Sequence, residues 1–393
     1  MRFYQIVAAF LFCAGSLFAQ GSMENVLRSV EANNKDLQAN AQLIQSRKLE
    51  ARLDNNLPDP SVSYSHQWGN KEGLGTQGEL IASQSFDFPT VYVQKHKLSK
   101  AKEAGLDRES AAYRQSILLK AKNVCLDLIL LNQQKTILDE RMRISERLSA
   151  LFATRLAEGE ANVLETNKVQ LELLNAKTEA RLNESARLVK LQELAVLNGG
   201  IEIPFNDTEY APTPDILSYE DLRDEVLDRD FRLLSLRSEQ VTAARQVSVN
   251  RSQWLPGFEL GYRLNTAVGG ERFNGILVGI TIPLFANRNH VKQAKAQALF
   301  TEMQLDNEAM AVETEFLELF NQAKALKTSL DEYEQVLKGT DNLALLNKAI
   351  EADQISMIEY FVNVTTYYES MQNYLQLRNQ YEKVMAELYK QRL

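Results

Sequence analysis

The sequence predicts a mainly α-helical protein with a small β part, built from two copies of a helix–β-hairpin–helix unit. The same order of patterns occurs twice, about 198 residues apart. A long stretch of helical periodicity ends at Leu57-Pro58 and again at Leu255-Pro256, and each time two short alternating segments and another long helical stretch follow. Only 17 Gly and 8 Pro occur in 393 residues. So few helix-breaking residues favour long, coiled-coil-like helices.

The first residues are predicted to be a secretory signal peptide, 1–19. Arg2 precedes an apolar run from Ile6 to Phe18, and Leu17-Phe18-Ala19 ends in a small residue that suits cleavage. The run is too short, and wrongly flanked, for a membrane span. Lipidation of Cys13 is not expected, because the bulky Phe12 precedes it where lipoprotein cysteines follow small residues.

The composition of the chain bears on its binding partners, on transmembrane helices and on cysteine chemistry. The chain has 44 Lys plus Arg against 52 Asp plus Glu, a formal net charge of -8, and no basic run with interleaved aromatic residues. We therefore expect no nucleic-acid partner. Beyond the signal the longest apolar stretch, Ile276 to Phe285, is too short for a transmembrane helix. Cys125 is the single cysteine of the mature chain, and its apolar neighbours predict a small buried side chain.

The long segments carry a coiled-coil seam, with apolar residues at alternating steps of three and four. The seam positions are Leu27, Val30, Asn34, Leu37, Ala41 and Ile44, and then Ile117, Ala121, Val124, Leu128, Leu131, Leu138 and Met142. Between Thr90 and Glu158 only Gly105 interrupts the pattern. A helix of that length would be roughly 100 Å long, too long for a compact globular domain. A coiled-coil rod would explain these helices equally well.

The short segments are predicted to be two β-hairpins, with strands at about 61–68 and 79–88, and at about 258–265 and 276–284. Each strand alternates apolar residues with small or polar ones, which is typical of strands in membrane barrels. We expect the apolar face to contact lipid. The residues assigned to it are Tyr64, Trp68, Leu80, Phe86, Leu260, Tyr262, Val278 and Ile280.

Four strands do not close a barrel by themselves. An open sheet edge is not tolerated in lipid, and about eight strands make the smallest closed transmembrane barrel. Several copies of the chain must therefore assemble if these hairpins cross a membrane. The alternative is a soluble pair of hairpins whose apolar face packs on the helices.

Three segments carry a resemblance to a known family. Gln84 to Pro89 leads into the basic segment Gln94 to Lys97, and Val278 to Phe285 is its counterpart in the second repeat. Residues 155–165 have Arg and Gly four residues apart in a helix-turn-helix pattern. With these segments the chain resembles the outer membrane efflux proteins, the TolC-like family, over essentially its whole mature length.

The resemblance implies a fold, a location and partners. Residues 20–200 would be the first TolC-like repeat, 201–213 a linker and 214–393 the second repeat. Three chains would form a homotrimer with a 12-stranded barrel in outer-membrane lipid and an α-helical barrel in the periplasm. A periplasmic adaptor (membrane fusion) protein and an inner-membrane transporter would be the partners. The expected location is the cell outer membrane, extending into the periplasm.

The function implied is a passive exit duct of a tripartite efflux pump, which exports small molecules or ions and is driven by the inner-membrane partner. A type I secretion exit duct and a structural coiled-coil envelope protein without a pore remain as alternatives. The substrate is not specified by the sequence.

The resemblance also places functional residues at two periplasmic tips, which would close the duct and dock the adaptor. Arg155 and Gly159 match the family's tip pattern. The second tip has Asp353 in place of Gly159, and Ala349 in place of Arg155, so it departs from that pattern. Acidic residues gather at both tips, namely Glu158, Glu160, Glu351 and Asp353. Threefold symmetry would turn each into a ring that favours cations, although acidic residues near a helix start are also common.

An enzymatic reading has little support in the residues. His66, His96 and His290 are isolated, and none belongs to a pair four residues apart on a helix, as a zinc site of the metalloprotease kind requires. We therefore predict no catalytic site, no metal site and no cofactor.

Overall fold

The structure is a computed structural model that describes residues 23–212, 216–337 and 342–393. The predicted signal peptide, 1–19, and Cys13 lie outside the described residues, as does the last position of the predicted linker, 201–213. The predicted fold class is confirmed, since the described chain is mostly helical with one small sheet. Within the described ranges no helix is long and apolar enough to cross a membrane.

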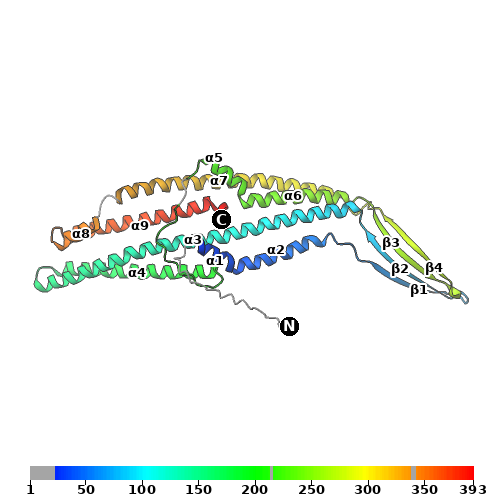
Figure 1. Ribbon diagram of the computed structural model, residues 1–393, viewed down its shortest axis with the longest axis horizontal. Coiled ribbons are helices and arrows are strands. Elements are labelled where there is room, and N and C mark those ends of the chain that lie inside the picture. Colours follow the sequence, from blue (N-terminus) through cyan, green and yellow to red (C-terminus); the bar gives the residue numbers. More distant parts are fainter. Residues whose placement is uncertain (1–22, 213–215, 338–341) are drawn as a thin grey trace, which may run out of the picture. The chain divides into compact units, whose positions relative to one another are not determined.

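The elements occur in the predicted order, with helices on either side of each hairpin (Figure 1). The first half contains α1 (Met23–Asn33), α2 (Lys35–Leu53), β1 (Ser61–Trp68), β2 (Thr76–Phe86), α3 (Pro89–Glu158) and α4 (Val163–Leu197). The second half contains α5 (Tyr219–Arg229), α6 (Phe231–Ser252), β3 (Gly257–Thr266), β4 (Arg272–Thr281), α7 (His290–Leu337), α8 (Asn342–Glu351) and α9 (Met357–Leu388). Short 3₁₀ turns occupy Val268–Gly270 and Lys390–Arg392.

The described residues form two compact units, and each unit takes segments from both predicted repeats. The first comprises 23–34, 120–212 and 326–386 without 338–341, and the second comprises 35–119, 216–325 and 387–393. The repeats are therefore copies of an element order rather than separate compact bodies.

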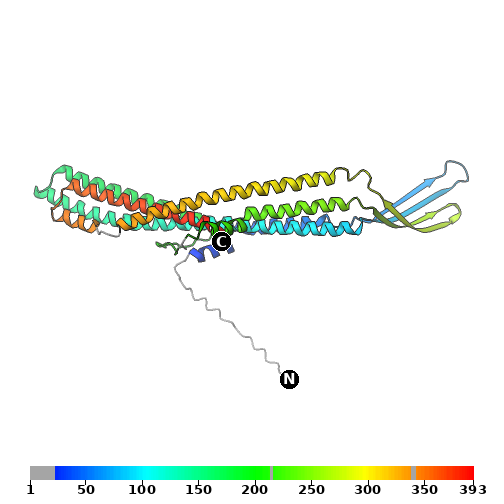
Figure 2. The same ribbon diagram turned by 90° about the horizontal axis from the view of Figure 1, so that it is seen from above.

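In the first unit α3 and α4 pack antiparallel, as in the views of Figures 1 and 2. Asp127 pairs with Lys190 at 3.2 Å, and Arg141 pairs with Glu172 at 2.7 Å. The predicted α3 seam is confirmed, because Ala121, Val124, Leu128 and Leu138 are buried. Cys125 is buried among them, and burial raises the pKa of its thiol to about 12. Such a thiol is inert at neutral pH.

The predicted linker is part of the core of the first unit. The Phe205 side chain is buried, and Asn132 Nδ2 donates to the Asp207 carbonyl at 2.9 Å. Asn379 Nδ2 from α9 donates to the Tyr210 hydroxyl at 3.4 Å. Side-chain amides thus pair with groups of a segment that has no helix or strand of its own.

The helix before each hairpin is broken, which corrects the continuous seam predicted from Leu27 to Ile44. Asn34 separates α1 from α2, and its Nδ2 donates to the Leu197 carbonyl at 2.7 Å. Asp230 separates α5 from α6, and its carboxylate accepts from the backbone amide of Arg232 at 2.8 Å. Short polar side chains that bond backbone groups compete with helix continuation. Asn34 is thus a break and not a tolerated polar seam position.

In the second unit the helix before each hairpin packs against the helix that follows it. Arg47 pairs with Glu109 at 2.8 Å, which ties α2 to α3. Asn250 Nδ2, near the end of α6, donates to the His290 carbonyl at the start of α7 at 3.0 Å.

The four strands form one antiparallel sheet in the order β1-β2-β3-β4, so β2 and β3 join the two hairpins (Figure 1). Directly opposite residues point to the same side of a sheet. Tyr64 stands opposite Leu80, and Leu260 stands opposite Val278. Every residue predicted to contact lipid is on one side, which we call the apolar face. The described residues leave it open, with Trp68 76% and Val278 69% exposed.

The bounds of two strands, β2 (Thr76–Phe86) and β4 (Arg272–Thr281), differ from the prediction by more than one residue. β2 ends at Phe86 and not at 88, because the Phe88 carbonyl accepts from the Val91 amide and so belongs to the start of α3. β4 runs from Arg272 to Thr281 and not from 276 to 284. Pro283 has no amide hydrogen for the ladder, and the Gly269-Gly270 turn allows pairing to begin earlier.

Leu128 tests the buried seam. We expect Leu128→Asp to lower the free energy of unfolding by about 3–5 kcal/mol, because it leaves an unpaired carboxylate in the core. Chemical denaturation followed by helical circular dichroism measures the change. Lys120→Asp is the matched control at an exposed position of α3 and should change stability by less than about 0.5 kcal/mol. Equal stability of the two variants would show that the seam face is open to solvent.

Candidate functional site

The first tip is a helix-turn-helix closed by a left-handed glycine. α3 ends at Glu158, and Gly159 has φ +80°. The Glu160 amide donates to the Arg155 carbonyl at 2.7 Å, and the Gly159 amide donates to the Leu156 carbonyl at 3.2 Å. This pair of bonds is the Schellman motif, which satisfies carbonyls at a helix end. A Cβ at residue 159 would meet no atom within 4 Å, so backbone conformation and not space requires the glycine.

The helix after the first tip starts with a capping box. Asn162 Oδ1 accepts from the Glu165 amide at 2.9 Å, and Glu165 Oε2 accepts from the Asn162 amide at 3.0 Å. These reciprocal bonds satisfy donors that a helix start leaves unpaired. The tip is therefore fixed at both of its helix ends.

The second tip has the same backbone geometry from different residues. Asp353 has φ +58°, the Gln354 amide donates to the Ala349 carbonyl at 2.8 Å, and the Asp353 amide donates to the Ile350 carbonyl at 3.3 Å. Ser356 Oγ then accepts from the Glu359 amide at 3.2 Å. Each group lies 194 residues after its counterpart in the first tip. The sequence departure at Asp353 is thus no departure in structure, because Asp is among the few non-glycine residues that adopt this conformation.

Arg155 joins the two tips. Its Nη1 lies 3.4 Å from Asp353 Oδ1, and its Nη2 donates to the Glu351 carbonyl at 3.2 Å. The Arg155 side chain is only 18% exposed, whereas Asp353 is 83% exposed. Arg147 adds a contact of 2.9 Å to Glu351 Oε1. The Arg155 side chain therefore links the two tips and is not free for docking in this structure. The sequence patterns did not indicate this contact, because Arg155 and Asp353 are 198 residues apart.

The four acidic residues of the tips fall into two classes. Glu351 and Asp353 pair with arginines. Glu158 and Glu160 are exposed and form no ion pair with any residue of the described ranges. These two carboxylates are available to ions or partners.

An aromatic and aliphatic cluster lies beneath both tips and holds them in place. It is formed by Leu148, Phe152, Val169, Ile350, Met357, Tyr360, Val364 and Tyr368. Arg155 stacks on it, with its guanidinium 5.3 Å from the Phe152 ring centre. The Tyr360 hydroxyl donates to Asn347 Oδ1 at 2.7 Å, and burial raises the pKa of this phenol.

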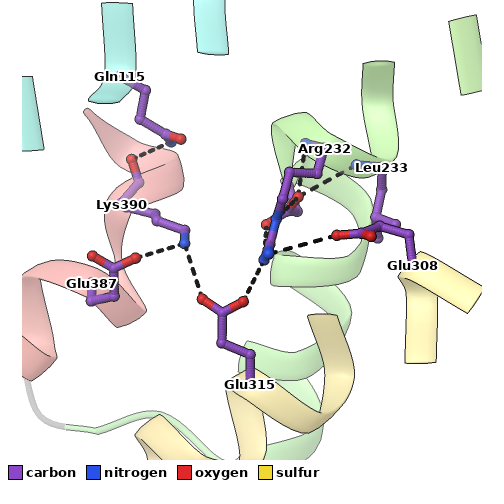
Figure 3. A network of polar contacts seen from close by, with 8 residues as sticks. Gln115, Arg232, Leu233, Glu308, Glu315, Glu387 and Lys390 are labelled. Atoms are coloured by element: carbon purple, nitrogen blue, oxygen red, sulfur yellow. Dashed lines mark hydrogen bonds and ion pairs between the residues drawn. The ribbon is translucent and has the colours of Figure 1, made fainter. Parts of the chain in front are cut away.

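The second unit holds an ionic network that sequence reasoning missed (Figure 3). Glu315 on α7 lies 2.7 Å from Arg232 and 3.6 Å from Lys390. Arg232 also pairs with Asp230 at 3.3 Å, and Gln115 Nε2 donates to the Lys390 carbonyl at 2.6 Å. The network fixes the helix break at Asp230 and the segment 387–393 to α7. An Asp before a helical run was the signal available in the sequence.

Within the described ranges no group of three or more His, Cys, Asp and Glu residues is placed to hold a metal ion. The Tyr64 hydroxyl lies 3.1 Å from His66 Nδ1 on the sheet, and the His290 carbonyl at the start of α7 accepts from Asn250 Nδ2.

Comparison with known proteins places the fold. No protein-family model and no curated protein sequence matches the chain. Solved structures do. CusC, described as forming a transmembrane channel, is 16% identical, with a TM-score of 0.78 over 95% of this chain and 92% of its own. The CmeC outer membrane channel of Campylobacter jejuni is 15% identical, with a TM-score of 0.73 over 94% of this chain and 85% of its own.

A third neighbour is the outer membrane protein VceC of Vibrio cholerae, 15% identical with a TM-score of 0.72 over 94% of both chains. The chain has the fold of outer-membrane channels. The predicted resemblance to TolC-like proteins is confirmed at the level of this channel fold.

Gly159 tests the first tip of the channel fold. We expect Gly159→Val to cost about 1–2 kcal/mol, because a β-branched residue is forced into the left-handed conformation. Hydrogen exchange at the Glu160 amide measures the effect, since that amide closes the turn. Gly159→Asn is the matched control and should keep its protection, because Asn tolerates this conformation. Full protection in the Val variant would mean that the turn does not need a positive φ.

Proposed function

We propose that the chain is one protomer of an outer-membrane exit duct that passes small molecules or ions out of the cell, driven by an inner-membrane partner. The observation that carries the proposal is the apolar face of the sheet, with large side chains such as Trp68 and Val278 left open to the surroundings. A sheet with one apolar and one polar side suits a wall between lipid and water. The fold shared with outer-membrane channels supports this interpretation.

The sheet edges support assembly into a homotrimer. β1 and β4 each pair with one neighbour within the described residues and leave the other side unpaired. Unpaired strand edges are templates for pairing with another chain. Three copies of the four-stranded sheet would give twelve strands, above the number needed to close a barrel in outer-membrane lipid.

The residues on the polar face of the sheet suit the inner wall of the proposed duct. Arg263 pairs with Glu79 on this face, and small residues such as Gly261 and Ser83 stand beside them. Gly261 is required by close strand approach, since a Cβ there would lie 2.7 Å from the Ala82 carbonyl oxygen. A neutral ion pair among small residues leaves room for solutes to pass.

The tips are proposed as the closure and the docking point for a periplasmic adaptor and an inner-membrane transporter. Arg155 holds the second tip through Asp353 and the Glu351 carbonyl, while Glu158 and Glu160 stay exposed. A duct needs no catalysis, because the partner pump supplies the energy. A type I secretion duct would use the same features, and no described residue favours it. A structural envelope protein without a pore has no use for an open apolar face.

Val278 tests membrane insertion. On the apolar face, Val278→Arg should cost roughly 2–4 kcal/mol in lipid and stop assembly in the outer membrane. Thr281→Arg, on the polar face of the same strand, is the matched control and should still assemble. Outer-membrane fractionation and the mobility of unheated trimers on a gel measure the difference. Equal assembly of the two variants would contradict the assignment of the sheet to a membrane.

The acidic tip set tests the conducting path. Changing Glu158, Glu160, Glu351 and Asp353 to Ala should lower the cation preference of the opened pore, because rings of acidic side chains attract cations. Reversal potentials in planar bilayers under a salt gradient measure the preference. Glu302→Ala with Asp306→Ala is a control pair of two exposed α7 residues of the second unit, which removes acidic charge outside the two tip segments. An assembled trimer that conducts no ions under any condition would count against the duct itself.

A further inference from the structure

The apolar face changes character along its strands. At the end nearest the helices, the register places Phe86 opposite Phe258, and Phe258 opposite Ile280. At the hairpin-turn end, one row across the sheet consists of polar or small residues. That row is His66, Gly78, Thr266 and Arg272. The face is thus apolar for most of its length and rich in hydrogen-bond donors at one end.

The charge on this face has a single sign. No Asp or Glu of the four strands stands on it, because Glu79 and Glu259 occupy the opposite, polar face. Arg272 is its one permanently charged side chain. Arg272 is exposed, and its side chain has no ion pair or hydrogen bond with any residue that the structure describes, whereas Arg263 on the polar face pairs with Glu79. An exposed guanidinium beside an apolar band lacks an anionic partner.

At the other end of this row, on β1, His66 also offers a hydrogen-bond donor to the surroundings. The Tyr64 hydroxyl lies 3.1 Å from His66 Nδ1. When the hydroxyl donates to Nδ1, the ring proton is on Nε2 and points a donor outward. Trp68 packs edge-on against His66, with ring centres 4.7 Å apart, and is itself exposed. Aromatic rings with a polar tip are favoured where lipid tails give way to head groups.

We propose that the turn end of the apolar face binds the anionic phosphate head groups of membrane lipids, with Arg272 as the main contact and His66, on the opposite edge strand, as a second donor. The acyl chains would lie along Leu264 and Leu80, one row closer to the helices. An amphiphile with an apolar tail and a negatively charged head group matches both the apolar band and the positive charge of Arg272 at its end. A protein partner would not require these two features together. The inference rests on the proposed outer-membrane function.

The test uses the purified wild-type trimer in phosphatidylcholine nanodiscs that contain either phosphatidic acid or diacylglycerol with the same acyl chains. These two probes differ only in the phosphate. Native mass spectrometry counts the lipids retained on the protein. We expect phosphatidic acid to be retained preferentially, and Arg272→Gln to reduce that preference about fivefold, the effect of one basic residue near an anionic surface.

Arg263→Gln is the matched control, since it removes an arginine of the same hairpin from the other face and should leave the preference unchanged. Equal retention of both probes by the wild type overturns the proposal without any variant. An unchanged preference in Arg272→Gln, or complete displacement of phosphatidic acid by excess inorganic phosphate, also overturns it. Outer-membrane assembly and ion conduction of the wild type are read separately, so a failed lipid site and a failed duct give different results.

Discussion

The pairing of β2 with β3 is the interaction on which the sheet depends. It joins the hairpins of the two repeats from Gly78 opposite Thr266 to Phe86 opposite Phe258. Because side chains alternate along a strand, a slip by one residue would move every apolar side chain of one hairpin to the polar face. The observed register keeps Leu80, Leu264 and their neighbours on the same side. Gly261 helps to fix it, since a Cβ there would collide with the β2 backbone.

The two tips show how one backbone geometry can come from different residues. Gly159 and Asp353 both adopt positive φ, and Asn162 and Ser356 both accept the amide three residues later. The chemistry nevertheless differs, because Asp353 brings a carboxylate that Gly159 lacks. That carboxylate meets Arg155 of the other tip. The repeats therefore interact through the position at which their sequences diverge.

Polar residues inside helical patterns were the main source of error in the sequence prediction. Asn34 fits the seam by spacing, yet it ends α1 and bonds the Leu197 carbonyl, far away in the chain. The spacing of residues indicates which side of a helix a residue occupies. It does not indicate whether a carbonyl from a distant segment lies within hydrogen-bond distance of that residue. The sequence likewise predicts a plain linker at 201–213, whereas Asn132 and Asn379 bind this segment to the helices.

The sequence by itself determined the class of fold, the length of α3, the four strands and the face on which each strand residue stands, because these follow from local periodicity of 3.6 or 2 residues. The resemblance to the TolC-like family also located both tips, with Gly159 in the first and Asp353 in the second. Only the tertiary structure decided that Arg155 joins the tips and that Glu315 pairs with the side chains of both Arg232 and Lys390. It also decided that Arg272 lies in the same row of the sheet as His66. Those arrangements depend on which segments far apart in the chain come together, and no local pattern carries that information.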